Sequence, residues 1–205
     1  MRKSFSNLAL TAVLGLAITF TLSCSGGDDD GGGGSCNVGR TVKIGNQTWM
    51  AENLNCNVNG SKCYKNDPSY CAEYGRLYDW ETAKKVCPSG WHLPSESDWD
   101  ELINYVESDN GCSSCAGKYL KSKSGWSSVG NGTDDYEFSA LPGGDYNGYD
   151  KNYYLGIGNY GVWWSATDYN TLNAYYRAII YNVDDVESDI PNGKKNLASV
   201  RCVQD

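Results

Sequence analysis

The chain has 205 residues, with 25 acidic against 17 basic side chains and a formal net charge of −8. This balance disfavours nucleic acid as a partner, because phosphates are bound by clustered Lys and Arg. The low charged fraction and the 24 Gly, 16 Tyr and 7 Trp residues favour a turn-rich domain with strands over a helical bundle.

The first 23 residues have the organisation of a bacterial export signal. Arg2 and Lys3 precede an uncharged stretch, residues 8–22, that is shorter than the ~20 apolar residues of a membrane span. The stretch leads to Cys24 and resembles a lipobox, in which the cysteine receives a diacylglycerol and cleavage occurs just before it. Thr21 departs from the usual aliphatic residue of that motif, and an ordinary secreted protein with an unlipidated Cys24 is the alternative.

A Gly- and Asp-rich segment, residues 24–35, follows and is typical of a flexible tether. We therefore expect an exported protein that is held to the membrane through lipid on Cys24, at the outer membrane or cell surface. Several acyl chains on one cysteine anchor a protein durably. The folded domain then spans residues 36–205, and loss of the signal peptide takes the net charge from −8 to −10 because Arg2 and Lys3 leave with it.

Eight cysteines remain once Cys24 is set aside, and an even number in an exported chain indicates a disulfide framework. Eight cysteines allow 105 connectivities, so the pairing stays open at this point. The ranked expectation is Cys87–Cys202, Cys63–Cys71, Cys112–Cys115 and, by elimination, Cys36–Cys56. The Cys-Ser-Ser-Cys spacing of the third pair also occurs in redox sites, but the setting lacks thioredoxin-like features and favours a structural bridge.

The first half of the domain predicts a hairpin, a surface loop and helices. Two β-prone runs, residues 41–44 and 47–50, flank Gly-Asn and predict a hairpin. Residues 53–70 are polar and predict a surface loop. Asp79 is placed to cap a short helix, with Ala83 and Val86 facing inward.

Further helices and a strand-rich second half complete the prediction. Ser95 and Asp98 resemble a capping box before a helix that runs to about Glu107. Its apolar face carries residues at helical spacing, namely Trp99, Leu102, Ile103 and Val106. A third short helix is predicted near residues 116–121. Strands are predicted within residues 161–166, 174–181 and 198–203. Helices followed by antiparallel strands indicate an α+β domain with two to three short helices and a twisted, mainly antiparallel sheet.

Several motifs in one order resemble the Fibrobacter succinogenes major paralogous domain. They are Ile44-Gly-Asn-Gln-Thr-Trp-Met-Ala-Glu-Asn-Leu54, Tyr74-Gly-Arg-Leu-Tyr-Asp-Trp80, Cys87-Pro-Ser-Gly-Trp-His-Leu-Pro-Ser-Glu-Ser-Asp-Trp99, Trp163-Trp-Ser-Ala166 and Ser199-Val-Arg-Cys202. The resemblance covers residues 39–205. It implies an exported protein, often a lipoprotein, from a family with no established biochemical activity.

The same resemblance implies a layout similar to C-type-lectin-like domains, in which a cysteine of the final strand reaches back to the end of the first helix. Those cysteines would be Cys87 and Cys202. The Glu-Pro-Asn, Gln-Pro-Asp and Trp-Asn-Asp motifs of calcium-dependent lectins are absent from the sequence. The formylglycine-generating enzymes share a related architecture, but their chemistry needs reactive thiols, and all eight cysteines here can pair.

The tyrosines of a Gly- and Asn-rich stretch are the candidate ligand-binding residues: Tyr146, Tyr149, Tyr153, Tyr154 and Tyr160. Tyrosine gives a large contact area at small entropic cost and is enriched in adaptable recognition loops. These rings would contact sugars or peptide side chains. The alternative is that they pack over the strands beneath them.

The remaining polar motifs predict no catalytic residue, metal or cofactor. His92 is the only histidine and lacks a partner histidine for a metal site. The acidic clusters at 134–135 and 184–189 lack EF-hand spacing and indicate solvated loops. We therefore expect a non-enzymatic lectin-like module that binds glycan or protein. The alternatives are a polysaccharide-active enzyme with paired carboxylates and a structural envelope protein without a small ligand.

Overall fold

A computed structural model of the protein describes residues 36–150 and 153–205, which belong to one compact unit. The expected signal peptide (1–23), Cys24 with its lipid and the tether (24–35) lie outside the described residues. Within the described part, no helix is long and apolar enough to cross a membrane.

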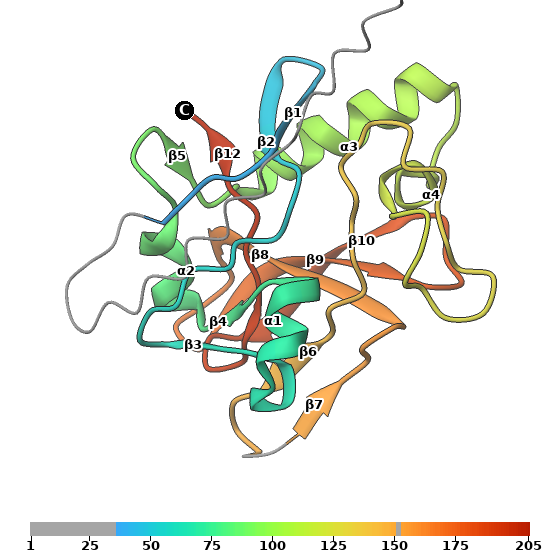
Figure 1. Cartoon of the computed structure of the whole chain (residues 1–205). Coiled ribbons are helices and arrows are strands. Elements are labelled where there is room, and N and C mark those ends of the chain that lie inside the picture. The colour runs from blue at the N-terminus through green and yellow to red at the C-terminus, as the bar shows by residue number, and fades with distance from the viewer. Residues whose placement is uncertain (1–35, 151–152) are drawn as a thin grey trace, which may run out of the picture. The chain divides into compact units, whose positions relative to one another are not determined.

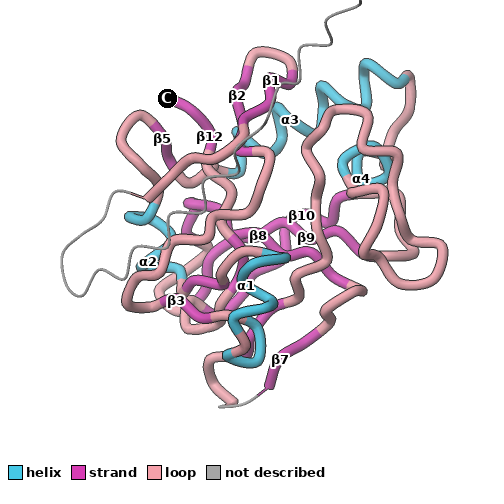
Figure 2. The backbone as a smooth tube through the Cα atoms, viewed as in Figure 1, coloured by secondary structure: helices cyan, strands magenta, loops and turns pink. Residues whose placement is uncertain are grey.

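The described residues form short helices and three sheets (Figure 1). The helices are η1 (Tyr64–Asn66), α1 (Pro68–Tyr74), α2 (Trp80–Val86), α3 (Glu96–Asn110) and α4 (Ala116–Leu120). The strands are β1 (Thr41–Ile44), β2 (Gln47–Met50), β3 (Ser61–Lys62), β4 (Leu77–Tyr78), β5 (Trp91–His92), β6 (Asp145–Asn147), β7 (Tyr153–Leu155), β8 (Tyr160–Asp168), β9 (Asn173–Ile180), β10 (Val186–Gly193), β11 (Ala198–Ser199) and β12 (Val203–Gln204). The connection between α4 and β6 is mostly loop (Figure 2).

The sheets are antiparallel except at one place. A four-stranded sheet has the order β1-β2-β12-β5, a six-stranded sheet has the order β10-β9-β8-β11-β4-β3, and β6 pairs with β7. The exception is β11, which runs parallel to β8 with Ser199 opposite Trp163. The α+β class is therefore confirmed.

The elements with strong local signals form where the sequence predicts them. β1 and β2 pair around Gly45, whose φ of 58° is readily adopted only by glycine. The Asp79 side chain accepts a hydrogen bond from Thr82 N at the start of α2. The capping box of α3 is complete, because Ser95 and Asp98 each bind the other's backbone N–H.

The predicted loop at residues 53–70 is wrong in part. It contains β3 and η1, and α1 begins at Pro68. The side chain of Asp67 accepts a hydrogen bond from Ser69 N at 2.9 Å, and proline suits the first helical position because its missing N–H has no helical acceptor. The sequence therefore carries a helix-start signal at Asp67 and Pro68. The helix is short, however, and lacks the long apolar face by which a helix is predicted from sequence.

Two predictions near the C-terminus, one of a strand and one of a loop, also need correction. The single strand expected at residues 198–203 is two short strands, β11 in the six-stranded sheet and β12 in the four-stranded sheet. The acidic segment at 184–189, expected to be a solvated loop, enters β10 at Val186. β10 pairs with β9 through a register shift between Glu187 and Ile190. Such a shift at an edge strand hinders pairing with another chain.

β8 lies at the centre of the core because both of its faces are covered. Trp163 packs with α3 and the four-stranded sheet, and its ring centroid lies 6.5 Å from that of Trp99. Val162 and Trp164 point to the other face, where they pack with α2. The run Gly-Val-Trp-Trp-Ser from residue 161 is therefore buried throughout and lacks the alternation of a strand with one solvated face.

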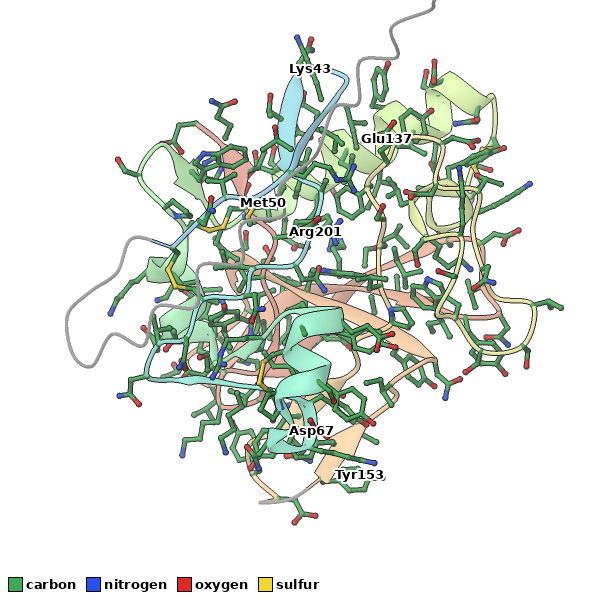
Figure 3. The ribbon with its side chains drawn as sticks, in the orientation of Figure 1. Lys43, Met50, Asp67, Glu137, Tyr153 and Arg201 are labelled. Atoms are coloured by element: carbon green, nitrogen blue, oxygen red, sulfur yellow. A yellow bond between two sulfur atoms is a disulfide. The ribbon has the colours of Figure 1, made fainter. Side chains whose placement is uncertain are left out.

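A buried polar cluster joins the segment between β11 and β12 to the rest of the core. The Arg201 guanidinium is fully buried and donates to Asn53 Oδ1 at 2.8 Å and to the carbonyl oxygens of Phe138 and Ser139. Asn53 Oδ1 also accepts from Trp163 Nε1 at 2.8 Å. Burial lowers the pKa of Arg201 from its ordinary value, because the charged form loses hydration. The cluster holds the crossing segment between the two larger sheets (Figure 3).

The eight cysteines of the domain form four disulfides in the pairs that the sequence ranked first. These are Cys36–Cys56, Cys63–Cys71, Cys87–Cys202 and Cys112–Cys115. The third bridge links the end of α2 to the residue before β12 across 115 positions of sequence. No thiol is therefore free in the described residues.

Candidate functional site

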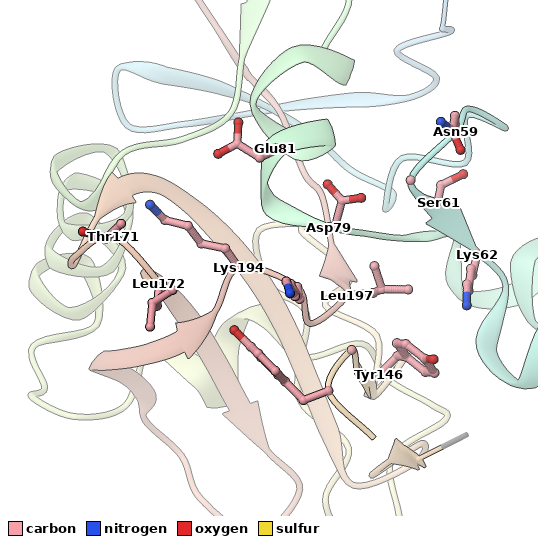
Figure 4. Close-up of a pocket in the computed structure, with 14 residues that line it drawn as sticks. Asn59, Ser61, Lys62, Asp79, Glu81, Tyr146, Thr171, Leu172, Lys194 and Leu197 are labelled. Carbon is pink, nitrogen blue, oxygen red and sulfur yellow. The ribbon is translucent and has the colours of Figure 1, made fainter. Parts of the chain in front are cut away.

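The described residues form an open groove of about 960 Å³ (Figure 4). We call it the lysine–tyrosine groove, and its lining residues are Asn59, Gly60, Ser61, Lys62, Asp79, Glu81, Tyr146, Gly148, Tyr149, Thr171, Leu172, Lys194, Lys195 and Leu197. Lys62 and Tyr146 lie at one end, Thr171 and Leu172 lie at the other, and Asp79 lies between them. Five separate segments of the chain thus contribute to one surface.

Backbone hydrogen bonds join these segments. Trp80 N donates to Lys194 O at 3.2 Å, and Lys194 N donates to Leu172 O at 2.9 Å. Asp79 N donates to Gly60 O at 3.0 Å, which places residues 59–62 against the start of α2. Because these are main-chain contacts, the shape of the groove does not depend on flexible side chains alone.

The tyrosine end is built by close approach of two backbones. Tyr146 and Leu197 exchange two backbone hydrogen bonds, of 3.0 and 2.9 Å. Two residues on, a Cβ at Gly148 would lie 1.7 Å from the carbonyl oxygen of Lys195, so only glycine fits. Gly148 N donates to Asn196 Oδ1 at 2.9 Å. These contacts fix the backbone from which Tyr149 projects.

Two large apolar side chains of the groove face solvent. Tyr149 is 58% exposed and Leu172 is 68% exposed. A Cβ at Gly193 would lie 2.5 Å from Tyr149 Cε2, so the ring packs directly on this bare stretch of β10 backbone. Exposed aromatic and aliphatic groups beside hydrogen-bonding side chains are the usual composition of a ligand site.

Some lysines in and beside the groove form ion pairs, and others do not. Lys194 is ion-paired with Asp168, and Lys84 beside the groove is ion-paired with Glu81 at 3.2 Å. In the described part of the chain, Lys62 and Lys195 have no carboxylate within ion-pair distance.

The ammonium groups of these two lysines lie near aromatic rings instead. The Nζ of Lys62 lies 4.6 Å from the ring centroid of Tyr146, and that of Lys195 lies 5.8 Å from the ring centroid of Tyr149. Such cation–π contacts hold an ammonium group without neutralising its charge.

The five candidate tyrosines do not form one surface. Tyr146 and Tyr149 line the groove, but Tyr146 is only 7% exposed, so its expected exposure is wrong. Tyr154 is half-buried, with ring centroids 4.7 Å from Tyr146 and 4.9 Å from Tyr64, so it packs over the core as the alternative expectation had it. Tyr153 and Tyr160 are exposed but are not among the groove residues.

Sequence patterns gave no local signal for the groove's other residues. Lys62, Leu172 and Lys194 lie in separate polar segments without a shared motif. Lys62 is on β3, whereas Leu172 and Lys194 lie beside the ends of β9 and β10, so only the assembled six-stranded sheet brings them to one surface. The stretch that holds the five candidate tyrosines supplies only one side of the groove, through Tyr146, Gly148 and Tyr149.

The histidine and the acidic clusters have local structural roles. His92 Nδ1 lies 2.7 Å from Asp205 Oδ1, and its Nε2 lies 3.4 Å from Asp98 Oδ2 at the start of α3. Asp134 accepts hydrogen bonds from the N–H and hydroxyl of Ser139. Across the described residues, no group of three or more His, Cys, Asp or Glu side chains is placed to hold a metal ion.

One carboxylate next to the groove is electrostatically unusual. Burial raises the pKa of Asp145 from 3.8 to about 6, because the charged form loses hydration there. Asp145 precedes Tyr146 on β6. Burial raises the pKa of Tyr64 and of Tyr176, and the nearby carboxylate of Asp145 raises both further. It does not line the groove.

Comparison with known proteins identifies the family of the chain. No curated protein matches the chain. The model of the Fibrobacter succinogenes major domain matches residues 42–204, which is most of the chain and nearly all of the folded unit described above. The chain therefore belongs to the Fibrobacter succinogenes major domain family.

Proposed function

We propose that the protein is a lipid-anchored, non-enzymatic recognition module that binds glycan in the lysine–tyrosine groove. The observation that carries the proposal is the groove itself, where Tyr149 and Leu172 expose apolar surface beside the polar side chains of Asn59, Ser61 and Thr171. Sugars present C–H faces next to hydroxyl groups, so a glycan site needs both kinds of contact at once.

The shape of the groove favours a polymer over a small metabolite. It is open along its length and bounded by side chains from five segments, whereas a small-molecule pocket buries most of its ligand. An extended chain of sugars could lie along it and contact Leu172 at one end and Tyr149 nearer the other.

The proposal includes a C-type-lectin-like arrangement of the fold. It is supported by two helices, α2 and α3, that precede a Trp-rich strand, and by the bridge from Cys87 at the end of α2 to Cys202 near the last strand. It is a likeness of layout, and the calcium motifs of sugar-binding C-type lectins are absent from the sequence.

Binding of the mature chain to defined polysaccharides tests the proposed function. The chain from residue 24 onward, with Cys24→Ala to keep it free of lipid, is produced under oxidising conditions and screened against immobilised neutral and acidic polysaccharides. We expect Tyr149→Ala to weaken binding about tenfold or more, since a central aromatic contact contributes about 2 kcal/mol or more.

Tyr153→Ala is the matched control, because Tyr153 is 50% exposed and lies outside the groove, on β7 (Figure 3). It should bind as the parent does. The proposal is wrong if no polysaccharide binds, or if Tyr149→Ala binds as well as Tyr153→Ala.

An enzyme is the second candidate, because two carboxylates, Asp79 and Glu81, line the same groove. A glycosidase needs a pair of carboxylates on either side of the bond it cleaves. Asp79 is held by Thr82 N as the cap of α2, and Glu81 is paired with Lys84. We therefore propose binding without cleavage. Release of reducing ends from any bound polymer, abolished by Glu81→Gln, would establish the enzyme instead.

The anchor is tested separately from the ligand. In cells, the full chain should incorporate labelled fatty acid and partition into detergent, and Cys24→Ala should abolish both. Labelling that persists in Cys24→Ala would disprove lipidation at this cysteine. An accessible epitope on intact cells would support the cell surface as its location.

A further inference from the structure

We infer that the ligand of the lysine–tyrosine groove is an acidic glycan, a polymer whose sugars carry carboxylates, with Lys62 and Lys195 as the residues that bind those carboxylates. This inference rests on the proposed function and specifies its ligand. The first observation that supports it is the charge of the groove. The chain has a net charge of −8, yet three lysines, Lys62, Lys194 and Lys195, line this one surface.

The charges of the groove do not cancel. Glu81 is neutralised by Lys84, and Lys194 is neutralised by Asp168. Asp79 faces the amino end of α2, whose backbone N–H groups stabilise a carboxylate. Lys62 and Lys195 remain as cations without an ion-pair partner in the described residues.

Both unpaired cations lie beside the groove's tyrosines. Lys62 is close to Tyr146, at 4.6 Å, and Lys195 is close to Tyr149, at 5.8 Å. Lys195 thus stands next to the exposed ring of Tyr149, which can contact a sugar face, while Lys62 is held over the buried ring of Tyr146 at the same end of the groove. A uronic acid presents the same combination, a pyranose ring that bears one carboxylate, so one sugar could contact a ring and an ammonium group together.

A neutral glycan would leave these two cations unused. Hydroxyl groups accept hydrogen bonds from an ammonium group, but hydrogen bonds to ionised acceptors are stronger and shorter. The site therefore discriminates in favour of the carboxylate form, even though the long-range field of an acidic protein repels a polyanion. The discrimination must then come from these local contacts.

The test compares two polymers that differ at one group of each sugar. Polygalacturonate and its methyl ester share one sugar backbone, and the ester lacks the carboxylate. We expect the mature Cys24→Ala chain to bind the acid form about tenfold more tightly, because two ammonium groups gain a charged acceptor. Lys62→Gln with Lys195→Gln should remove that preference.

Lys43→Gln with Lys123→Gln provides the charge-matched control for the double lysine variant, because Lys123 is also exposed and outside the groove. Lys43 is an exposed lysine of β1, outside the groove (Figure 3), and its loss changes the net charge as each groove substitution does. This control variant should keep the preference for the acid form. Unaltered urea unfolding of each variant shows that the fold is intact.

The outcomes separate this inference from the proposed function. Equal binding of both polymers by the parent, or an undiminished preference in the double lysine variant, overturns the acidic-glycan inference while the groove remains a glycan site if Tyr149→Ala loses binding. Failure to bind any polysaccharide overturns both. Polyglutamate that binds as tightly as polygalacturonate would show that the ligand is an acidic protein segment and would also overturn the inference.

Discussion

Removal of the Cys87–Cys202 bridge should destabilise the domain more than removal of any other disulfide. Cross-links reduce the conformational entropy of the unfolded chain, and the effect grows with the logarithm of the loop they close. The Cys87–Cys202 bridge spans 115 positions and the Cys63–Cys71 bridge spans 8. The relation gives about 4.8 kcal/mol for the first and about 2.5 kcal/mol for the second at 25 °C.

Loop length is the main difference between the two bridges. Cys202, Cys63 and Cys71 are buried and Cys87 is half-buried, so each double alanine substitution leaves only small cavities. Both cysteines of a pair are replaced together, which avoids an unpaired thiol that could exchange with the remaining bridges.

The assay is equilibrium unfolding in urea, followed by the fluorescence of the tryptophans. We expect Cys87→Ala with Cys202→Ala to lose about 2 kcal/mol more than Cys63→Ala with Cys71→Ala. Its m-value should rise more, because the longer released loop lets the unfolded chain expand. Equal losses from the two pairs, or a larger loss from the short loop, would refute the entropic reasoning.

Three further substitutions test other parts of the structure. The pKa of Asp145 is raised from 3.8 to about 6 in the folded state, so the folded protein binds this proton more tightly than the unfolded chain does. The free energy of unfolding, relative to that of Asp145→Asn, should therefore fall by about 2–3 kcal/mol as the pH rises from 4 to 6. Unfolding free energies of the two proteins that vary in parallel with pH would contradict this prediction. Ser95→Ala should lower the free energy of unfolding by about 1 kcal/mol through loss of the α3 cap, whereas Ser97→Ala on the exposed face should change it little by the same urea assay. Lys121→Met should lose about 2–4 kcal/mol, since the buried ammonium donates to three carbonyl oxygens, among them Val183 O at 2.9 Å; a thermal midpoint equal to that of the parent would show that the contacts contribute nothing.

Local sequence signals were sufficient to predict the helices whose first residues are capped by a side chain. Asp79, the Ser95–Asp98 pair and the Gly45 turn each act within a few residues, so the sequence alone shows where α2, α3 and the first hairpin begin. The same kind of signal at Asp67 was outweighed by the polarity of its surroundings, because α1 buries few of its side chains.

The features that were not predictable from the sequence depend on contacts between residues far apart in the chain. The strand expected at 198–203 is broken because Arg201 must reach Asn53 and Phe138 between the sheets. Composition could not tell exposed Tyr149 from buried Tyr146, since which way each ring faces depends on where β6 docks. The groove is assembled from segments far apart in sequence, so no motif announces it.

The crossing of residues 198–204 from one sheet to the other has a consequence for the order of folding. β11 lies between β8 and β4, and β12 lies between β2 and β5, so both larger sheets lack an inner strand until this segment arrives. A chain that emerges amino end first can form its hairpin and its capped helices early, but neither sheet can be completed. Both sheets are therefore completed by the last residues of the domain, and a truncation before residue 198 would leave both sheets open at once.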